Sequence, residues 1–129
     1  MNILNCGDKG GVYFSNTGGC YVHSETVLDW YDASREFKKN GGDLATIANQ
    51  DTHDFLVSFV NIQNSYCWIG AERNSGVWSW ADGTPWTGFE KWNSGEPDKG
   101  NDNVGVGLSS SYKWYDWVKT QTHYYLCQY

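Results

Sequence analysis

Residues 67–83 read CWIGAERNSGVWSWADG, and here the chain changes from helical to extended patterning. Trp-Ile-Gly at 68–70 predicts the start of one strand, and Val-Trp-Ser-Trp at 77–80 alternates as a second strand would. Residues 81–111 are rich in glycine and lack periodicity, which predicts a long loop. Such a loop in a compact domain is usually functional.

Upstream of this stretch, the first of two expected helices opens at Thr26, with Asp29 three positions later as a capping-box acid. Gly-Gly at 41–42 ends the helix. Its apolar stripe is formed by Trp30, Ala33 and Phe37.

A second helix is predicted after an extended link at 44–47, with Asn49 or Asp51 as its N-cap. Its expected buried face consists of Phe55, Leu56, Phe59 and Val60. Residues 124–127 predict a closing strand. Two helices followed by short strands and one long loop indicate an α+β fold, and a length of 129 residues argues for one domain over 1–129.

The composition excludes several function classes. The net charge is -6 with 9 Lys and Arg, so the clustered basic surface that nucleic acid requires is not expected. No run approaches the roughly 18 apolar residues that span a bilayer, so membrane insertion is not expected either. Aromatic residues reach 17% with 8 Trp, which suggests packed flat side chains or an aromatic surface for a ligand.

Four cysteines, an even number, suggest two disulfides and an oxidising compartment, so we expect a mature secreted, extracellular domain. They are Cys6, Cys20, Cys67 and Cys127, and arithmetic alone allows three pairings. The glycine-rich stretch 6–20 reads as a hairpin closed by its own disulfide. Paired metal-ligand spacings such as Cys-x-x-Cys do not occur.

A series of motifs runs in order from about residue 6 to the last residue. They are Cys-Tyr at 20–21, Trp-Ile-Gly at 68–70, Trp-Ser-Trp at 78–80 with Asp-Gly at 82–83, Gly-Glu-Pro-Asp at 95–98, and Tyr-Leu-Cys at 125–127. In this order the chain resembles the C-type lectin and C-type lectin-like domain family. The resemblance implies a C-type lectin-like fold, with two helices, short antiparallel sheets and a long calcium-binding loop.

The resemblance also implies a Ca²⁺ site in that loop. Glu96 and Asp98 flank Pro97, and in the family the Glu-Pro bond is typically cis, which brings the flanking side chains to one side. Asp102 matches a third acid and Asp116 matches the closing Asp of the Trp-Asn-Asp motif. Carboxylate oxygens suit calcium, and four converging carboxylates repel one another without a cation. The alternative is that these are ordinary solvated loop acids.

Four positions depart from the cysteine pattern of the family. Phe37 stands where a helix cysteine normally pairs with the terminal one, and Val104 with Lys119 stand at the loop-closing bridge. Cys67 stands where the family usually has no cysteine. The resemblance implies a Cys6–Cys20 bond, and we expect Cys67–Cys127 as a substitute, with an intermolecular bridge through Cys67 as the alternative.

The sugar preference is mixed, because members with Glu-Pro-Asn generally favour mannose-type sugars and members with Gln-Pro-Asp favour galactose-type ones. Here both side chains of Glu-Pro-Asp only accept hydrogen bonds. Tyr115 replaces the Asn of Trp-Asn-Asp and removes a calcium ligand and a donor. Ring stacking could then orient the sugar, with Tyr115, Tyr112 and Trp117 as candidates.

The leading hypothesis is a calcium-dependent, carbohydrate-binding lectin that makes and breaks no bond. Because single shallow sites bind weakly, a homodimer or higher homo-oligomer is expected. The alternative is a lectin-like domain that binds no sugar and recognises protein or another surface. Glu96 and Asp116 could be drawn as a glycosidase pair, but a loop rich in Gly and Asp does not provide the apolar pocket that raises an acid's pKa.

Overall fold

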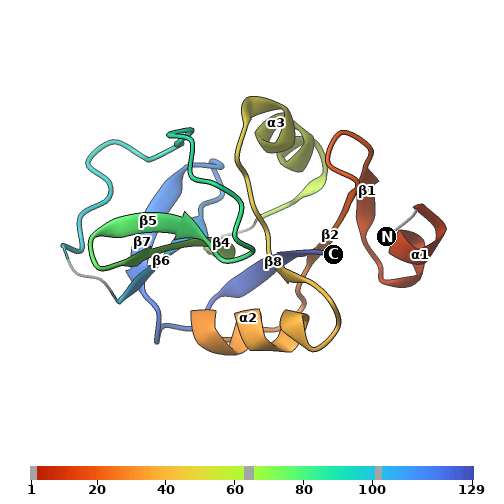
Figure 1. Cartoon of the computed structure of the whole chain (residues 1–129), viewed down its shortest axis with the longest axis horizontal. Helices are drawn as coiled ribbons and strands as arrows, with labels where there is room; N and C mark the ends of the chain where they lie inside the picture. Colours follow the sequence, from red (N-terminus) through yellow and green to blue (C-terminus); the bar gives the residue numbers. More distant parts are fainter. Residues whose placement is uncertain (1–2, 63–65, 101–102) are drawn as a thin grey trace.

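The computed structural model describes residues 3–62, 66–100 and 103–129 (Figure 1). The helices are α1 (Ile3–Asp8), α2 (Trp30–Lys38) and α3 (Gln50–Phe59). The strands are β1 (Val12–Phe14), β2 (Gly19–His23), β3 (Asp43–Leu44), β4 (Cys67–Asn74), β5 (Val77–Trp80), β6 (Val104–Leu108), β7 (Trp114–Val118) and β8 (Tyr124–Gln128). In the part of the chain so described, no helix has the length and hydropathy to cross a membrane.

The strands pair in the order β1-β2-β8-β4-β6-β7, with β3 added to β8 and β5 added to β4. All pairs are antiparallel except β4 and β8, which run parallel. In Figure 1, α2 and α3 lie on opposite sides of these strands. Each helix covers its own core cluster, so the predicted α+β class is confirmed.

Helix α2 begins at Trp30, and the predicted start at Thr26 is wrong. Asp29 is itself the N-cap and accepts a hydrogen bond from the Asp32 amide at 2.8 Å. The residues before it are extended because Leu28 exchanges two backbone hydrogen bonds with His123, at 3.1 and 3.0 Å. A pairing distant in sequence therefore overrides the capping pattern. The predicted stripe Trp30, Ala33 and Phe37 is buried as expected.

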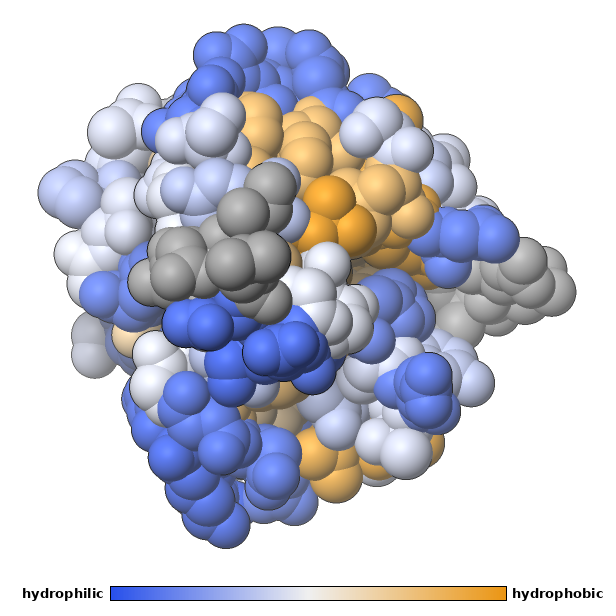
Figure 2. Space-filling view, turned by 90° about the vertical axis from the view of Figure 1, so that its right-hand side faces the viewer, coloured by the Kyte–Doolittle hydropathy of each residue, from blue (hydrophilic) through white to orange (hydrophobic). Residues whose placement is uncertain are grey.

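Helix α3 is capped by Asn49, the first of the two predicted caps, whose side chain accepts from the Thr52 amide at 2.9 Å. Leu56 and Val60 are buried as expected. Phe55 and Phe59 are only half-buried, contrary to the prediction. Phe55 stacks instead on Phe14 of β1 at 4.2 Å between ring centroids. Hydrophobic surface is accordingly visible on the side of the molecule that carries α3 and β1 (Figure 2).

Strand β6 lies within residues 81–111, where the sequence predicted a loop without periodicity. Every residue of β6 is buried, although two of the five are glycines. A Cβ atom at Gly105 would lie 2.4 Å from Cδ1 of Trp30, and one at Gly107 would lie 3.1 Å from Cδ1 of Trp117. The glycines thus make room for neighbouring indoles. This strand is specified by packing, which local patterning does not reveal.

Cys6 and Cys20 form the expected disulfide, which ties α1 to β2. Cys67 and Cys127 are free thiols, so the predicted bond between them is wrong. In the parallel pair, Cys67 lies opposite Tyr124, which places Cys127 three positions further along β8. Cys67 packs on the α3 side and Cys127 on the α2 side. Residues on opposite faces of a sheet cannot form a disulfide. Because Cys67 is fully buried, the alternative of a bond to a second chain is unsupported too.

Other interactions occupy the positions of the missing family bridges. The Phe37 ring contacts the rings of Tyr125 at 5.4 Å and Tyr129 at 5.8 Å, in the same cluster as Cys127. At the loop-closing position, the buried ammonium of Lys119 lies 2.7 Å from the Glu72 carboxylate on β4. The aromatic contact therefore joins the helix and the closing strand that the family usually joins covalently, whereas the partly buried ion pair joins Lys119 to β4 and not to the segment of Val104.

We predict that the native protein shows no fast-reacting thiol and that unfolding exposes two. Burial raises the pKa of both Cys67 and Cys127, so neither thiolate forms readily at neutral pH. Ellman's reagent, added with and without guanidinium under non-reducing conditions, measures the number of reactive thiols in the unfolded and in the native protein. Zero thiols after unfolding would mean that a second disulfide exists after all.

Candidate calcium site

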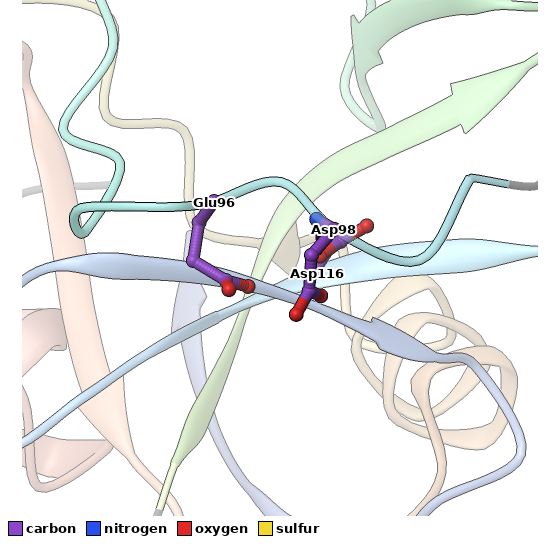
Figure 3. Close-up of side chains that lie close together, drawn as sticks. All are labelled: Glu96, Asp98 and Asp116. Atoms are coloured by element: carbon purple, nitrogen blue, oxygen red, sulfur yellow. Dashed lines mark hydrogen bonds between the residues drawn. The ribbon is translucent and has the colours of Figure 1, made fainter.

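Glu96, Asp98 and Asp116 come together, as the sequence predicts. Each contributes one carboxylate oxygen to a group in which all three oxygens lie within 4.8 Å of one another. Glu96 and Asp98 lie on the loop before β6, and Asp116 lies in the middle of β7 (Figure 3). The Glu96-Pro97 bond is cis, as expected. We call Glu96, Asp98 and Asp116 the acid cluster.

Asp116 anchors the loop that carries the other two acids. Its side chain is fully buried and accepts two backbone hydrogen bonds, from the Asp98 amide at 2.9 Å and the Lys99 amide at 3.0 Å. Upstream, Trp114 of β7 donates to the Lys91 carbonyl at 2.8 Å and accepts from the Asn93 amide at 3.0 Å. The segment 91–99 is thus fastened alongside β7 at several points, which fixes where its carboxylates lie.

The acids of the cluster differ in electrostatic environment. Burial, together with the charges of Asp98 and Asp116, raises the pKa of Glu96. Its Oε1 atom is buried and has no hydrogen-bond partner among the residues that the structure describes. The pKa of the exposed Asp98 is lowered, chiefly by the Lys99 ammonium, which donates to Asp98 Oδ1 at 2.6 Å. Glu96 is therefore the acid that most lacks a cation.

The acid cluster fits a calcium ion. Its donors are all oxygens, which calcium prefers, and a bound cation would relieve the repulsion that raises the pKa of Glu96. The unpartnered Glu96 Oε1 is a lone acceptor of the kind that a metal satisfies. Asp102, the fourth predicted ligand, lies outside the described residues.

Tyr115 and Trp117, two of the candidate stacking residues, adjoin the acid cluster. Their rings are stacked with 6.5 Å between centroids, and Tyr66 contacts them at 5.1 and 4.8 Å. The Lys99 ammonium links this group to the acids, because it lies 4.7 Å from the centre of the Trp117 ring. Sequence reasoning missed both Tyr66 and Lys99. No spacing pattern connects Tyr66 to acids at least 30 residues downstream, but Lys99 directly follows the Glu-Pro-Asp motif and could have been noticed.

Tyr112, the third candidate for stacking, is engaged elsewhere. It lies in the turn between β6 and β7, and its hydroxyl donates to the Val60 carbonyl. Its ring packs against the core cluster on the α3 side. The structure therefore does not join Tyr112 to the acid cluster.

The fold and the acid cluster together define a lectin-type domain, and sequence comparison agrees. The family model "Lectin C-type domain" matches residues 26–129. The chain belongs to the C-type lectin domain family.

The names of individual relatives describe different activities, from sugar binding to antifreeze activity. The chain is 30% identical over 115 residues to "C-type lectin domain family 4 member M" of Symphalangus syndactylus, covering 86% of this chain and 27% of that protein. It is 29% identical over 85 residues to "Galactose-specific lectin nattectin" of Thalassophryne nattereri, covering 62% of this chain and 53% of that protein. A solved "Ca2+-dependent type II antifreeze protein (Ca2+-free form)" shares the fold, with a TM-score of 0.80 and 24% sequence identity. The match covers 92% of this chain and 96% of that protein.

The chain spans only about a quarter to two fifths of the length of the first curated relatives it matches. The family assignment therefore concerns the domain, and the activities of those whole proteins are not transferred with it.

Replacing Glu96 by Gln is expected to raise slightly the melting temperature of the metal-free protein at pH 7. The pKa of Glu96 in the fold lies above its usual value of 4.5, so ionising this carboxylate costs more in the folded than in the unfolded chain. That cost is absent below the pKa of the unfolded chain, grows as the pH rises above it, and is complete above the raised pKa of the folded protein. The difference between variant and parent should therefore grow from pH 4 to pH 7.

Thermal melts in EDTA over this pH range test the prediction. Glu90→Gln, which changes an exposed acid of the same loop, is the matched control. A Glu96→Gln variant that is less stable than the parent at pH 7 would contradict the electrostatic explanation.

Proposed function

We propose that the protein is a calcium-dependent carbohydrate-binding lectin. Glu96, Asp98 and Asp116 would hold the ion, with Asp102 completing the donor set. The observation that carries this proposal is that one carboxylate oxygen from each of the three acids lies within 4.8 Å of the other two. Glu96 and Asp98 flank Pro97, after a cis Glu-Pro bond, and Glu96 Oε1 has no hydrogen-bond partner among the described residues. Calcium takes six to eight oxygen ligands, so such a cluster leaves positions for ligand hydroxyls.

When bound, the ion supplies direct ligation of sugar hydroxyls. The residues of the chain orient the sugar around that contact. Glu96 and Asp98 accept hydrogen bonds from hydroxyl groups, because an ionised carboxylate has several lone pairs and no proton to donate. Each carboxylate oxygen of Asp116 accepts a hydrogen bond from a backbone amide of the loop, and these bonds keep the loop acids in place.

The neighbouring aromatic group supports a role in orientation. Trp117 and Tyr115 are half-buried, so part of each ring remains accessible beside the acids. Sugars present an apolar C–H face that packs on aromatic rings, and such contacts carry much of the energy of small-ligand sites. We propose that these two rings, supported by Tyr66, provide the apolar side of the site.

The second candidate function is recognition of a non-sugar surface. Tyr115 stands where the family places an Asn that donates a hydrogen bond and ligates calcium. The Lys99 ammonium already donates a hydrogen bond to the Asp98 carboxylate. The fold itself allows this alternative, because function depends on the site and one fold serves many ligands. In either case, weak single sites favour an oligomer, in which linked sites raise the effective concentration. We propose that this oligomer is secreted, in keeping with the Cys6–Cys20 disulfide.

Sugar binding should depend on calcium. On a glycan array, the purified protein is expected to give signals in calcium that disappear in EDTA. Calcium should also raise the melting temperature, since a ligand that binds only the folded state adds about 2.7 kcal/mol at a hundred times its Kd. An unchanged melting curve would reject the metal site. Sugar signals that persist in EDTA would reject calcium as the sugar's ligand, and a blank array with a calcium-dependent melt would favour the non-sugar alternative.

Asp98→Asn is expected to shift the ranking of sugars towards mannose-type ligands. The amide of Asn donates a hydrogen bond that a carboxylate cannot, and it also releases Lys99 from its ion pair. The same array measures the change, with Asp82→Asn, an exposed acid, as the control. Identical profiles for Asp98→Asn and the parent would show that residue 98 does not select the sugar.

A further inference from the structure

The acid cluster already contains a cation that belongs to the protein. The Lys99 ammonium donates to Asp98 Oδ1 at 2.6 Å and lies 4.7 Å from the centre of the Trp117 ring. The lysine side chain is only 28% exposed, although the Asp98 side chain is 50% exposed. One of the proposed calcium ligands therefore has a positively charged partner in the structure.

The backbone holds Lys99 in this position. The amides of Asp98 and Lys99 donate to the two oxygens of the same buried carboxylate, that of Asp116. Neither residue can move away from Asp116 without losing a partly buried hydrogen bond. The Lys99 ammonium and the Asp98 carboxylate can therefore separate by rotation of either side chain, while the fixed backbone keeps the ammonium close to the site.

Calcium and the ammonium compete for the same oxygens. A coordinated calcium ion lies 2.3–2.6 Å from a carboxylate oxygen. An ammonium that kept its 2.6 Å hydrogen bond to that carboxylate would lie within a few ångströms of the ion. Two positive charges at such a distance repel each other, even at the surface of a protein. Calcium binding must then either break the Lys99–Asp98 ion pair or leave Asp98 as a weak ligand of the ion.

We infer that Lys99 and calcium are alternative partners of Asp98, and that Lys99 sets the calcium concentration at which the site fills. This inference rests on the proposed function, because it concerns the same metal. In the metal-free state the Lys99 ammonium neutralises part of the charge of the acid cluster. In the metal-bound state the ammonium swings away from Asp98, with the Trp117 ring as a neighbouring contact.

Calcium titration of three variants by calorimetry tests the inference. Lys99→Gln removes the competing charge and should bind calcium about three- to tenfold more tightly than the parent. Lys99→Arg keeps the charge and should stay within about twofold of the parent. Lys91→Gln is the matched control, because it makes the same change in net charge in the same loop, where the Lys91 ammonium faces the Phe89 ring at 5.6 Å. It should change the affinity by less than about twofold.

The outcomes separate this inference from the proposed function. Equal affinities for the parent and Lys99→Gln would overturn the inference and leave the calcium site standing. An equal gain for Lys91→Gln would also overturn it, since net charge would then be the cause. Absence of binding by the parent and every variant would overturn the calcium site itself. Binding by Lys99→Gln alone would support the inference in its strongest form.

A direct measurement on the unmutated protein complements the titration. In ¹H–¹⁵N spectra of the lysine ammonium groups, a hydrogen-bonded Lys99 signal is expected in EDTA, and calcium should shift or abolish it while the Lys91 signal stays unchanged. A Lys99 signal that calcium leaves unchanged, while calorimetry shows binding, would overturn the exchange.

Discussion

The candidate site depends on one buried carboxylate. Asp116 has no exposed surface, yet it is a charged group in the middle of a strand, and it is stable there because two loop amides donate to it. The same two bonds determine the path of the loop beside β7. The positions of Asp98 and Lys99 follow from that path, and Glu96, on the other side of Pro97, lies in the same acid cluster. A single structural acid thus organises an otherwise polar and solvated segment.

Local sequence signals predicted the elements that local interactions build. The stripe of Trp30, Ala33 and Phe37 identified α2, and Asn49 was recognised as the possible cap of α3. The start of α2 was misplaced because Leu28 pairs with a residue almost a hundred positions away. Strand β6 escaped prediction for a similar reason, since Gly105 is required by the indole of Trp30 and by nothing in its own neighbourhood. Long-range packing leaves no periodic trace in the sequence.

Glu96 and Asp98 were predictable because one short motif carries both, and Asp116 was predictable from the resemblance to the family, whereas their surroundings were not. Tyr66, which directly precedes β4, meets the aromatic group through the pairing of β4 with β6 and of β6 with β7, which spacing does not reveal. The cysteines illustrate the opposite error. An even number favours pairing, but whether two cysteines can meet depends on the faces of the sheet they occupy, and Cys67 and Cys127 occupy different faces.

The partly buried ion pair of Lys119 and Glu72 has a consequence for the environments in which the chain after β7 stays tied to β4. A covalent cross-link at this position would be cut by reductants, whereas an ion pair, flanked by the Trp30 ring at 4.5 Å, is indifferent to them. The tie between the end of β7 and β4 is therefore independent of redox state. Only the N-terminal hairpin, closed by Cys6 and Cys20, remains subject to thiol exchange. Reduction of this domain would loosen its N-terminal edge and spare the half that carries the acid cluster.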